Sequence, residues 1–167
     1  MQSYRVTKYD PKERNGHGAY VVEDWISSSN IGDSINGQVL TLDNYLQCEN
    51  NYVRCIKQLL SLAEISDLKV ASLEDYREDS GTEYNSTFGD TNYNLRFKEG
   101  QVIRGELISS IIRLALREEL WCKLECPNGF IHFGHDFYCY VGIPIAIDIG
   151  TVEIPGIFIE KFESPYL

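Results

Sequence analysis

Residues 106–126 read ELISSIIRLALREELWCKLEC, and the spacing of the apolar side chains changes within this stretch. In its first half, isoleucines and leucines recur every three or four residues, which is typical of an amphipathic helix. From Leu120 onward, apolar and polar residues alternate, which is typical of a strand with one buried face. The stretch therefore predicts a helix over about 105–119 that is followed directly by a strand.

The same two patterns extend in both directions from this stretch. Residues 41–64 form a second helical pattern, which Thr41 can cap. Turn residues such as Pro127-Asn128-Gly129 separate the apolar runs that follow residue 126. Because helices and strands are grouped, we expect an α+β fold, with a mostly antiparallel sheet and both amphipathic helices on one face. A doubly wound parallel sheet is the alternative. The expected strands are 3–9, 19–23, 68–72, 120–126, 130–133, 137–141 and 157–162, with a hairpin of 93–97 and 101–104.

A length of 167 residues, 43% of them hydrophobic, fits a single globular domain over 1–167. Such a chain buries enough surface to fold without metal or disulfide staples. The five cysteines have no Cys-x-x-Cys spacing, and no apolar leader opens the sequence. We therefore expect buried free thiols, no cofactor and a cytoplasmic protein.

The charge of the chain narrows the choice of partner. Fifteen Lys and Arg residues against 25 Asp and Glu residues give a net charge of −10. This charge repels phosphate backbones and anionic lipids, so nucleic acid and membranes are excluded as expected partners. It favours a basic protein or a cation instead.

Acidic residues are dense between positions 74 and 90, which we predict to be part of a loop over 74–92. Aromatic residues lie among the carboxylates, a mixture that suits a Lys- and Arg-rich cleft. A solvated loop without a partner is the alternative, and another acidic group near the end of the chain, Glu153, Glu160 and Glu163, is a second possible interface. The candidate partner-binding residues are Glu74, Asp75, Tyr76, Glu78, Asp79, Glu83, Tyr84 and Asp90.

His132, His135 and Asp136 are the candidate residues for a metal or acid–base site, with His17 brought near by folding. Imidazole and carboxylate groups can bind zinc or transfer protons. However, a turn at Gly134 separates the two histidines, and a metal site needs three or four converging ligands. We therefore expect no metal and no catalytic residues here, although a small metal- or ligand-binding enzyme domain is the competing function.

Six segments of the chain together carry a resemblance to known proteins: 25–32, 42–46, 117–125, 132–138, 156–160 and 164–166. They resemble a family of small bacterial proteins that are similar to the immunity proteins of polymorphic toxin systems, including contact-dependent growth inhibition. The resemblance carries no catalytic residues. It implies a non-enzymatic cytoplasmic protein that binds a cognate basic toxin domain, such as a nuclease (RNase), and blocks its active site or an exosite. A regulatory subunit with another basic partner is a third class.

Overall fold

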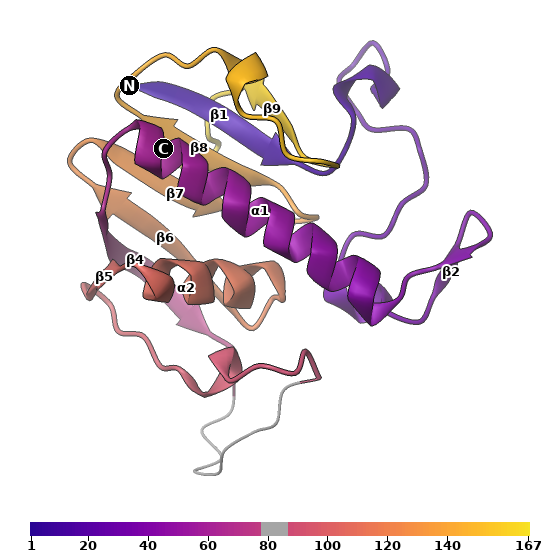
Figure 1. Cartoon of the computed structure of the whole chain (residues 1–167), viewed down its shortest axis with the longest axis horizontal. Helices are drawn as coiled ribbons and strands as arrows, with labels where there is room; N and C mark the ends of the chain where they lie inside the picture. Colours follow the sequence, from indigo (N-terminus) through magenta and orange to yellow (C-terminus); the bar gives the residue numbers. More distant parts are fainter. Residues whose placement is uncertain (78–86) are drawn as a thin grey trace.

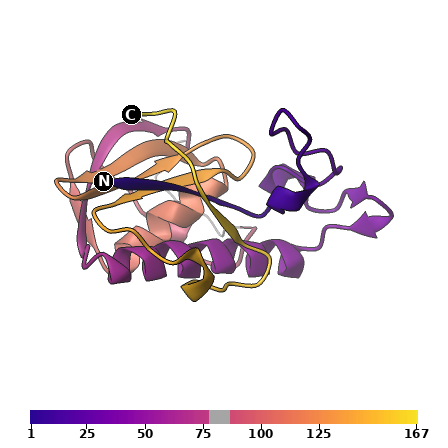
Figure 2. The same cartoon turned by 90° about the horizontal axis from the view of Figure 1, so that it is seen from above.

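The computed structural model describes residues 1–77 and 87–167. Within these residues, seven strands form one antiparallel sheet in the order β5-β4-β6-β7-β8-β1-β9. Two α-helices cover one face of this sheet, as Figures 1 and 2 show. The predicted α+β fold is confirmed. The strands are β1 (Gln2–Thr7), β4 (Asp67–Asp75), β5 (Val102–Arg104), β6 (Leu120–Cys126), β7 (Gly129–Phe133), β8 (Cys139–Ile143) and β9 (Phe158–Lys161).

Both predicted helices form, each a few residues shorter than the pattern indicates: α1 spans Leu42–Leu62 and α2 spans Glu106–Leu116. The Thr41 hydroxyl accepts the backbone N–H of Asn44 at 3.2 Å, which satisfies one of the free N–H groups of the first turn of α1. Gly105, with φ +54°, follows β5 directly and is the N-cap residue of α2. Neither helix is long and apolar enough to cross a membrane, a statement that covers the described part of the chain.

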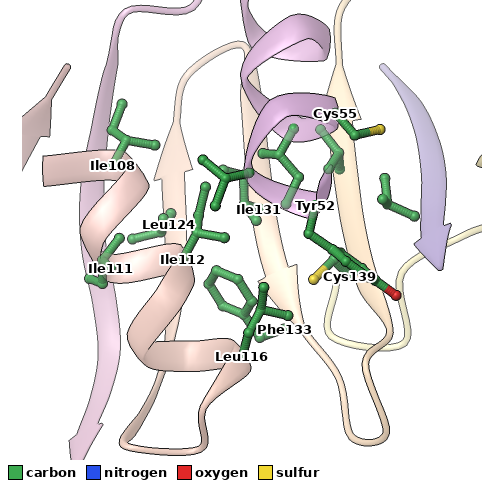
Figure 3. Close-up of a cluster of buried hydrophobic side chains, with 14 of the residues drawn as sticks. Tyr52, Cys55, Ile108, Ile111, Ile112, Leu116, Leu124, Ile131, Phe133 and Cys139 are labelled. Carbon is green, nitrogen blue, oxygen red and sulfur yellow. The ribbon is translucent and has the colours of Figure 1, made fainter. Parts of the chain in front are cut away.

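The core lies between the helices and the sheet (Figure 3). Helix α2 directs isoleucines toward the sheet, and α1 directs Tyr52 and Cys55 toward it. The alternation predicted for β6 is confirmed, because Leu120, Cys122 and Leu124 are all buried on this face. All five cysteines are free, and burial raises the pKa of the Cys55 and Cys122 thiols to about 12. These thiols therefore stay protonated and act as core side chains.

The opposite face of the sheet carries a row of polar and aromatic residues. The strand registers place Lys123, His132, Tyr140, Arg5 and Glu160 beside one another across β6, β7, β8, β1 and β9. The C-terminal residues cross part of this face, because the Lys123 Nζ donates to the Tyr166 carbonyl at 2.5 Å.

Strand β4 is longer than predicted, and this change shortens the predicted acidic loop. The register shifts after Ala71, and Ser72 has a φ of +52°. The Glu99 carboxylate accepts the N–H groups of Ser72 and Leu73, at 3.1 and 2.9 Å. The strand continues through this bulge to Asp75. Glu74 and Asp75 are therefore strand residues and not loop residues.

The predicted hairpin of 93–97 and 101–104 is wrong. Residues Asn92–Asn94 form a short 3-10 helix, and β5 pairs with β4 instead. The Arg77 guanidinium donates hydrogen bonds to the backbone carbonyls of Tyr93 and Leu95, at 2.9 and 2.7 Å. These carbonyls are therefore not available as acceptors for a neighbouring strand.

Two other predicted strands also differ. Strand β8 begins at Cys139 and not at Phe137, because Asp136 and Phe137 both have positive φ angles, which regular strand backbone does not contain. Residues 19–23 form no strand beyond the isolated bridge between Arg14 and Tyr20, and they belong to a segment that leaves the sheet.

Candidate functional site

The structure separates the residues of the predicted histidine site. His132 is buried on the face of the sheet opposite the helices. Its Nδ1 lies 2.8 Å from the Ser164 hydroxyl, and its Nε2 lies 3.6 Å from the Glu125 carboxylate. Burial lowers the pKa of His132, and Lys123 adds to this effect, so the neutral imidazole is favoured.

His135 and Asp136 are exposed in the β7–β8 turn, and His17 is exposed in the N-terminal part of the chain. In residues 1–77 and 87–167, no three His, Cys, Asp or Glu side chains are grouped as a metal site would require. His132 instead packs in the sheet, with its ring stacked on Phe130 at 4.2 Å.

The candidate partner-binding residues of the acidic segment have different surroundings. Glu78, Asp79, Glu83 and Tyr84 lie outside the described residues. Glu74 and Tyr76 are exposed at the end of β4, where the Tyr76 hydroxyl donates to Glu74 at 2.9 Å. Asp75 and Asp90, in contrast, are bound to arginines of the same chain.

Asp75 forms two short hydrogen bonds with the Arg77 guanidinium, at 2.8 and 2.6 Å. The Asp90 carboxylate accepts two hydrogen bonds from the Arg117 guanidinium, at 3.1 and 2.7 Å. Burial opposes the ionisation of both carboxyls, but the hydrogen bonds from the arginines outweigh it and lower both pKa values. These two charges are therefore largely neutralised within the protein.

A buried ion cluster lies beneath Asp90, and the sequence patterns did not predict it. Glu49, which is 0% exposed, accepts two hydrogen bonds of 2.7 Å from Arg117 and one of 2.7 Å from Arg113. The Phe88 ring lies 4.1 Å from the Arg117 guanidinium. One signal was present: Glu49 follows Tyr45 by four residues and precedes Tyr52 by three, so it lies on the apolar face of α1.

Cationic residues are distributed unevenly along the chain. The chain has no Lys or Arg from residue 15 to residue 53, while ten of its fifteen cationic residues lie between 54 and 123. We call residues 10–40 the N-terminal arm. Most of the arm, residues 15–40, belongs to the stretch without Lys or Arg. Figures 1 and 2 show that the arm extends beyond one end of the sheet, next to the beginning of α1.

The arm contains little regular structure but has many anchors. The Trp25 ring packs against Tyr45 and Phe137, with centroid distances of 5.6 and 4.9 Å. The ammonium of Lys8 lies 2.5 Å from Asp24 and 4.1 Å from the centre of the Trp25 ring. These contacts connect the arm to β1, α1 and the β7–β8 turn at once.

Serines provide further anchors. The Ser27 and Ser28 hydroxyls donate to the Glu118 carboxylate at 3.0 Å and to the Arg117 carbonyl at 3.4 Å. Ser27 also caps the 3-10 helix Ser28–Asn30. The bonds from both serines to the end of α2 fix the arm in one position.

A two-stranded hairpin forms the far end of the arm. It consists of β2 (Ser34–Ile35) and β3 (Gln38–Val39), joined by Asn36 and Gly37 with φ angles of +52° and +77°. Two consecutive positive φ angles are typical of the type I′ turn that Asn-Gly favours. The Asn36 side-chain amide donates to the carbonyl of Glu23 at 2.6 Å, which ties the turn back to the arm.

A surface hollow of about 310 Å³ lies between the hairpin, the arm and the first turn of α1. Its walls combine aromatic rings, carboxylates and amides, a composition suited to a cationic side chain. Its lining residues include Tyr20, Glu23, Asp24, Trp25, Asn36 and Asn44.

Apolar side chains are exposed along the arm, and Val22 and Val39 among them line this hollow. They are β-branched and lie on a well-anchored backbone, so their exposure is not the result of a loose segment. Exposed apolar groups beside unpaired carboxylates are typical of a protein-binding surface. The most exposed are Val21 (61%), Ile26 (48%) and Val39 (53%).

The chain matches no family model, no curated protein and no solved structure.

Proposed function

We propose that this protein is a non-enzymatic inhibitor that binds a basic toxin domain, such as a nuclease (RNase), and covers its active site or an exosite. The observation that carries the proposal is the segregation of charge. Residues 15–53 contain no Lys or Arg, and residues 15–40 of this stretch lie at one end of the molecule, where apolar side chains are exposed and the Lys8 ammonium is paired with Asp24. Such a surface attracts a Lys- and Arg-rich cleft and then contacts it at close range.

Two exposed carboxylates outside the arm also lie at this end of the molecule. Asp43 is exposed in the first turn of α1, and Asp136 is exposed in the turn whose Phe137 packs against Trp25. A nuclease cleft must attract phosphates, so carboxylates placed in it occupy the positions of the substrate charges.

The test uses the product of the reading frame next to this chain's gene, which the proposal expects to carry a basic toxin domain. At an equimolar ratio the purified protein should abolish the activity of that domain, since neutralisation of a lethal enzyme needs a dissociation constant of about 1 nM or less. Full activity of a verified cognate domain would contradict the proposal. Stoichiometric zinc or manganese in the purified protein would favour the enzyme alternative instead.

A further inference from the structure

We propose that the β2–β3 hairpin enters the basic cleft of the partner domain, and that the hollow beneath it receives a lysine or arginine side chain of that domain. The inference rests on the proposed function and names the surface and the partner chemistry. Three independent features of the arm support it: its rigidity, its exposed apolar groups and the composition of the hollow.

The first feature is preorganisation. The hairpin has only two residues in each strand, and an isolated two-stranded hairpin is at best marginally stable in water. Here the Gly32 N–H donates to the Leu40 carbonyl at 2.8 Å, and the Leu40 N–H donates to the Asp33 carbonyl at 3.0 Å, so its base is closed. A hairpin held in this way loses little conformational entropy on binding.

The second feature is where the apolar groups point. Trp25 is directed inward, against Tyr45, while its neighbour Ile26 is exposed. Val39 is also exposed, in a strand whose next residue, Leu40, is buried. The arm thus divides its apolar side chains between the core and the solvent, and Val39 of the solvent-exposed group lines the hollow.

The third feature is the chemistry of the hollow. Asp24 and the Trp25 ring already hold one ammonium group, that of Lys8, so the combination of carboxylate and aromatic ring binds a cation within this molecule. Glu23 lies next to them in the wall of the hollow, and no described residue forms an ion pair with it. An incoming lysine or arginine would pair with Glu23 and pack on the aromatic wall.

The occupant is therefore a protein cleft rich in lysine and arginine. The charge excludes an acidic peptide or a second copy of this chain, because both carry the same sign as the arm. The hairpin is narrow enough to enter a cleft, whereas the sheet and α1 form a broad surface (Figure 2).

A peptide titration tests the surface without the partner. A hexa-arginine peptide is added to the ¹⁵N-labelled protein at low salt, with hexa-glutamate as the control peptide. We expect the amide shifts to change mainly in residues 20–44, and the Glu23→Gln variant to bind about tenfold more weakly, which equals about 1.4 kcal/mol. Glu64→Gln, at the far end of α1, is the matched control and should bind like the unmodified chain. Shifts centred on another surface would overturn the inference.

The cognate domain then separates the two proposals. A Glu23→Gln and Val39→Ser double variant should neutralise the domain at least tenfold less well than the unmodified protein, while both proteins unfold at the same temperature. If the double variant neutralises the domain equally well, the hairpin is not the interface, and the proposed function stands. If the unmodified protein itself fails to neutralise it, the proposed function is wrong.

Discussion

Two acidic regions of this molecule differ in what their carboxylates do. At the ends of the sequence run 74–90, Asp75 and Asp90 each bind an arginine of the same chain. In the N-terminal arm, Glu23 lines an open hollow beside exposed valines. The density of acidic residues in the sequence is higher in the first region, but two of its carboxylates are paired with arginines, whereas Glu23 of the second forms no ion pair with a described residue. Charge becomes a binding surface only where no internal cation neutralises it.

The largest expected effect concerns the ion cluster. Replacing Arg117 with Met leaves Glu49 buried with only Arg113 as a partner, and we expect a loss of about 3–5 kcal/mol in the free energy of unfolding. Urea denaturation measures this loss. Arg113→Met is the control and should cost much less, because Glu49 keeps both bonds to Arg117. Equal losses in the two variants would show that the cluster does not depend on Arg117.

A smaller effect is expected from the anchor of the arm. Trp25→Ala removes a half-buried ring from its contacts with Tyr45 and Phe137, and should cost about 2 kcal/mol. The arm should also become more sensitive to limited proteolysis between residues 15 and 40. The neighbouring Ile26→Ala variant should change stability by less than about 0.5 kcal/mol. A proteolysis pattern unchanged by Trp25→Ala would mean that the other anchors suffice.

Acid should weaken the internal pairs of the first region. The pKa of Asp90 is lowered in the folded protein, so its bond to Arg117 contributes fully above the usual carboxyl range, near pH 4, and is lost as the pH falls below it. Because Asp90 is partly exposed, the contribution is less than about 1 kcal/mol. The Asp90→Asn variant should be less stable than the unmodified protein at pH 7, and the two curves should converge toward pH 2. A constant difference between the curves would contradict this assignment.

The smallest effect is expected at the exposed end of β4. Tyr76 is 59% exposed, and among the described residues its hydroxyl donates a hydrogen bond only to the neighbouring exposed Glu74. Glu74→Gln and Tyr76→Ala should each change the free energy of unfolding by less than about 0.5 kcal/mol. If either variant also weakens neutralisation of the cognate domain, the acidic segment takes part in binding, and the contrast between the two regions is less sharp than the ion pairs indicate.

The sequence predicted the fold well where periodicity alone determines it. Helices α1 and α2 and strand β6 follow repeats of 3.6 and 2 residues, and the structure confirms all three. The sequence predicted the strand bounds less well where a side chain, and not a neighbouring strand, accepts backbone N–H groups. An example is the Glu99 carboxylate, which accepts the N–H of Ser72 at the bulge. Such contacts join residues 27 positions apart, and no local pattern records them.

The sequence patterns placed the expected interface in the acidic run 74–90 and did not single out the N-terminal arm. Net charge indicated a basic partner, but the position of the available carboxylates depends on long-range pairs such as Glu49 with Arg117. The bonds of Ser27 and Ser28 to residues at the end of α2 became visible only in three dimensions. The absence of Lys and Arg from residue 15 to residue 53 was a readable signal that total charge concealed.

The exposed valines of the arm also affect how the isolated protein behaves in a concentrated sample. Molecules that each carry ten excess negative charges repel one another, and this repulsion keeps their apolar ends apart. Added salt shortens the range of that repulsion to about 3 Å at 1 M. The isolated protein should therefore be purified at low ionic strength. Light scattering should increase with ionic strength, and this increase should be smaller for the Val39→Ser variant than for the unmodified protein.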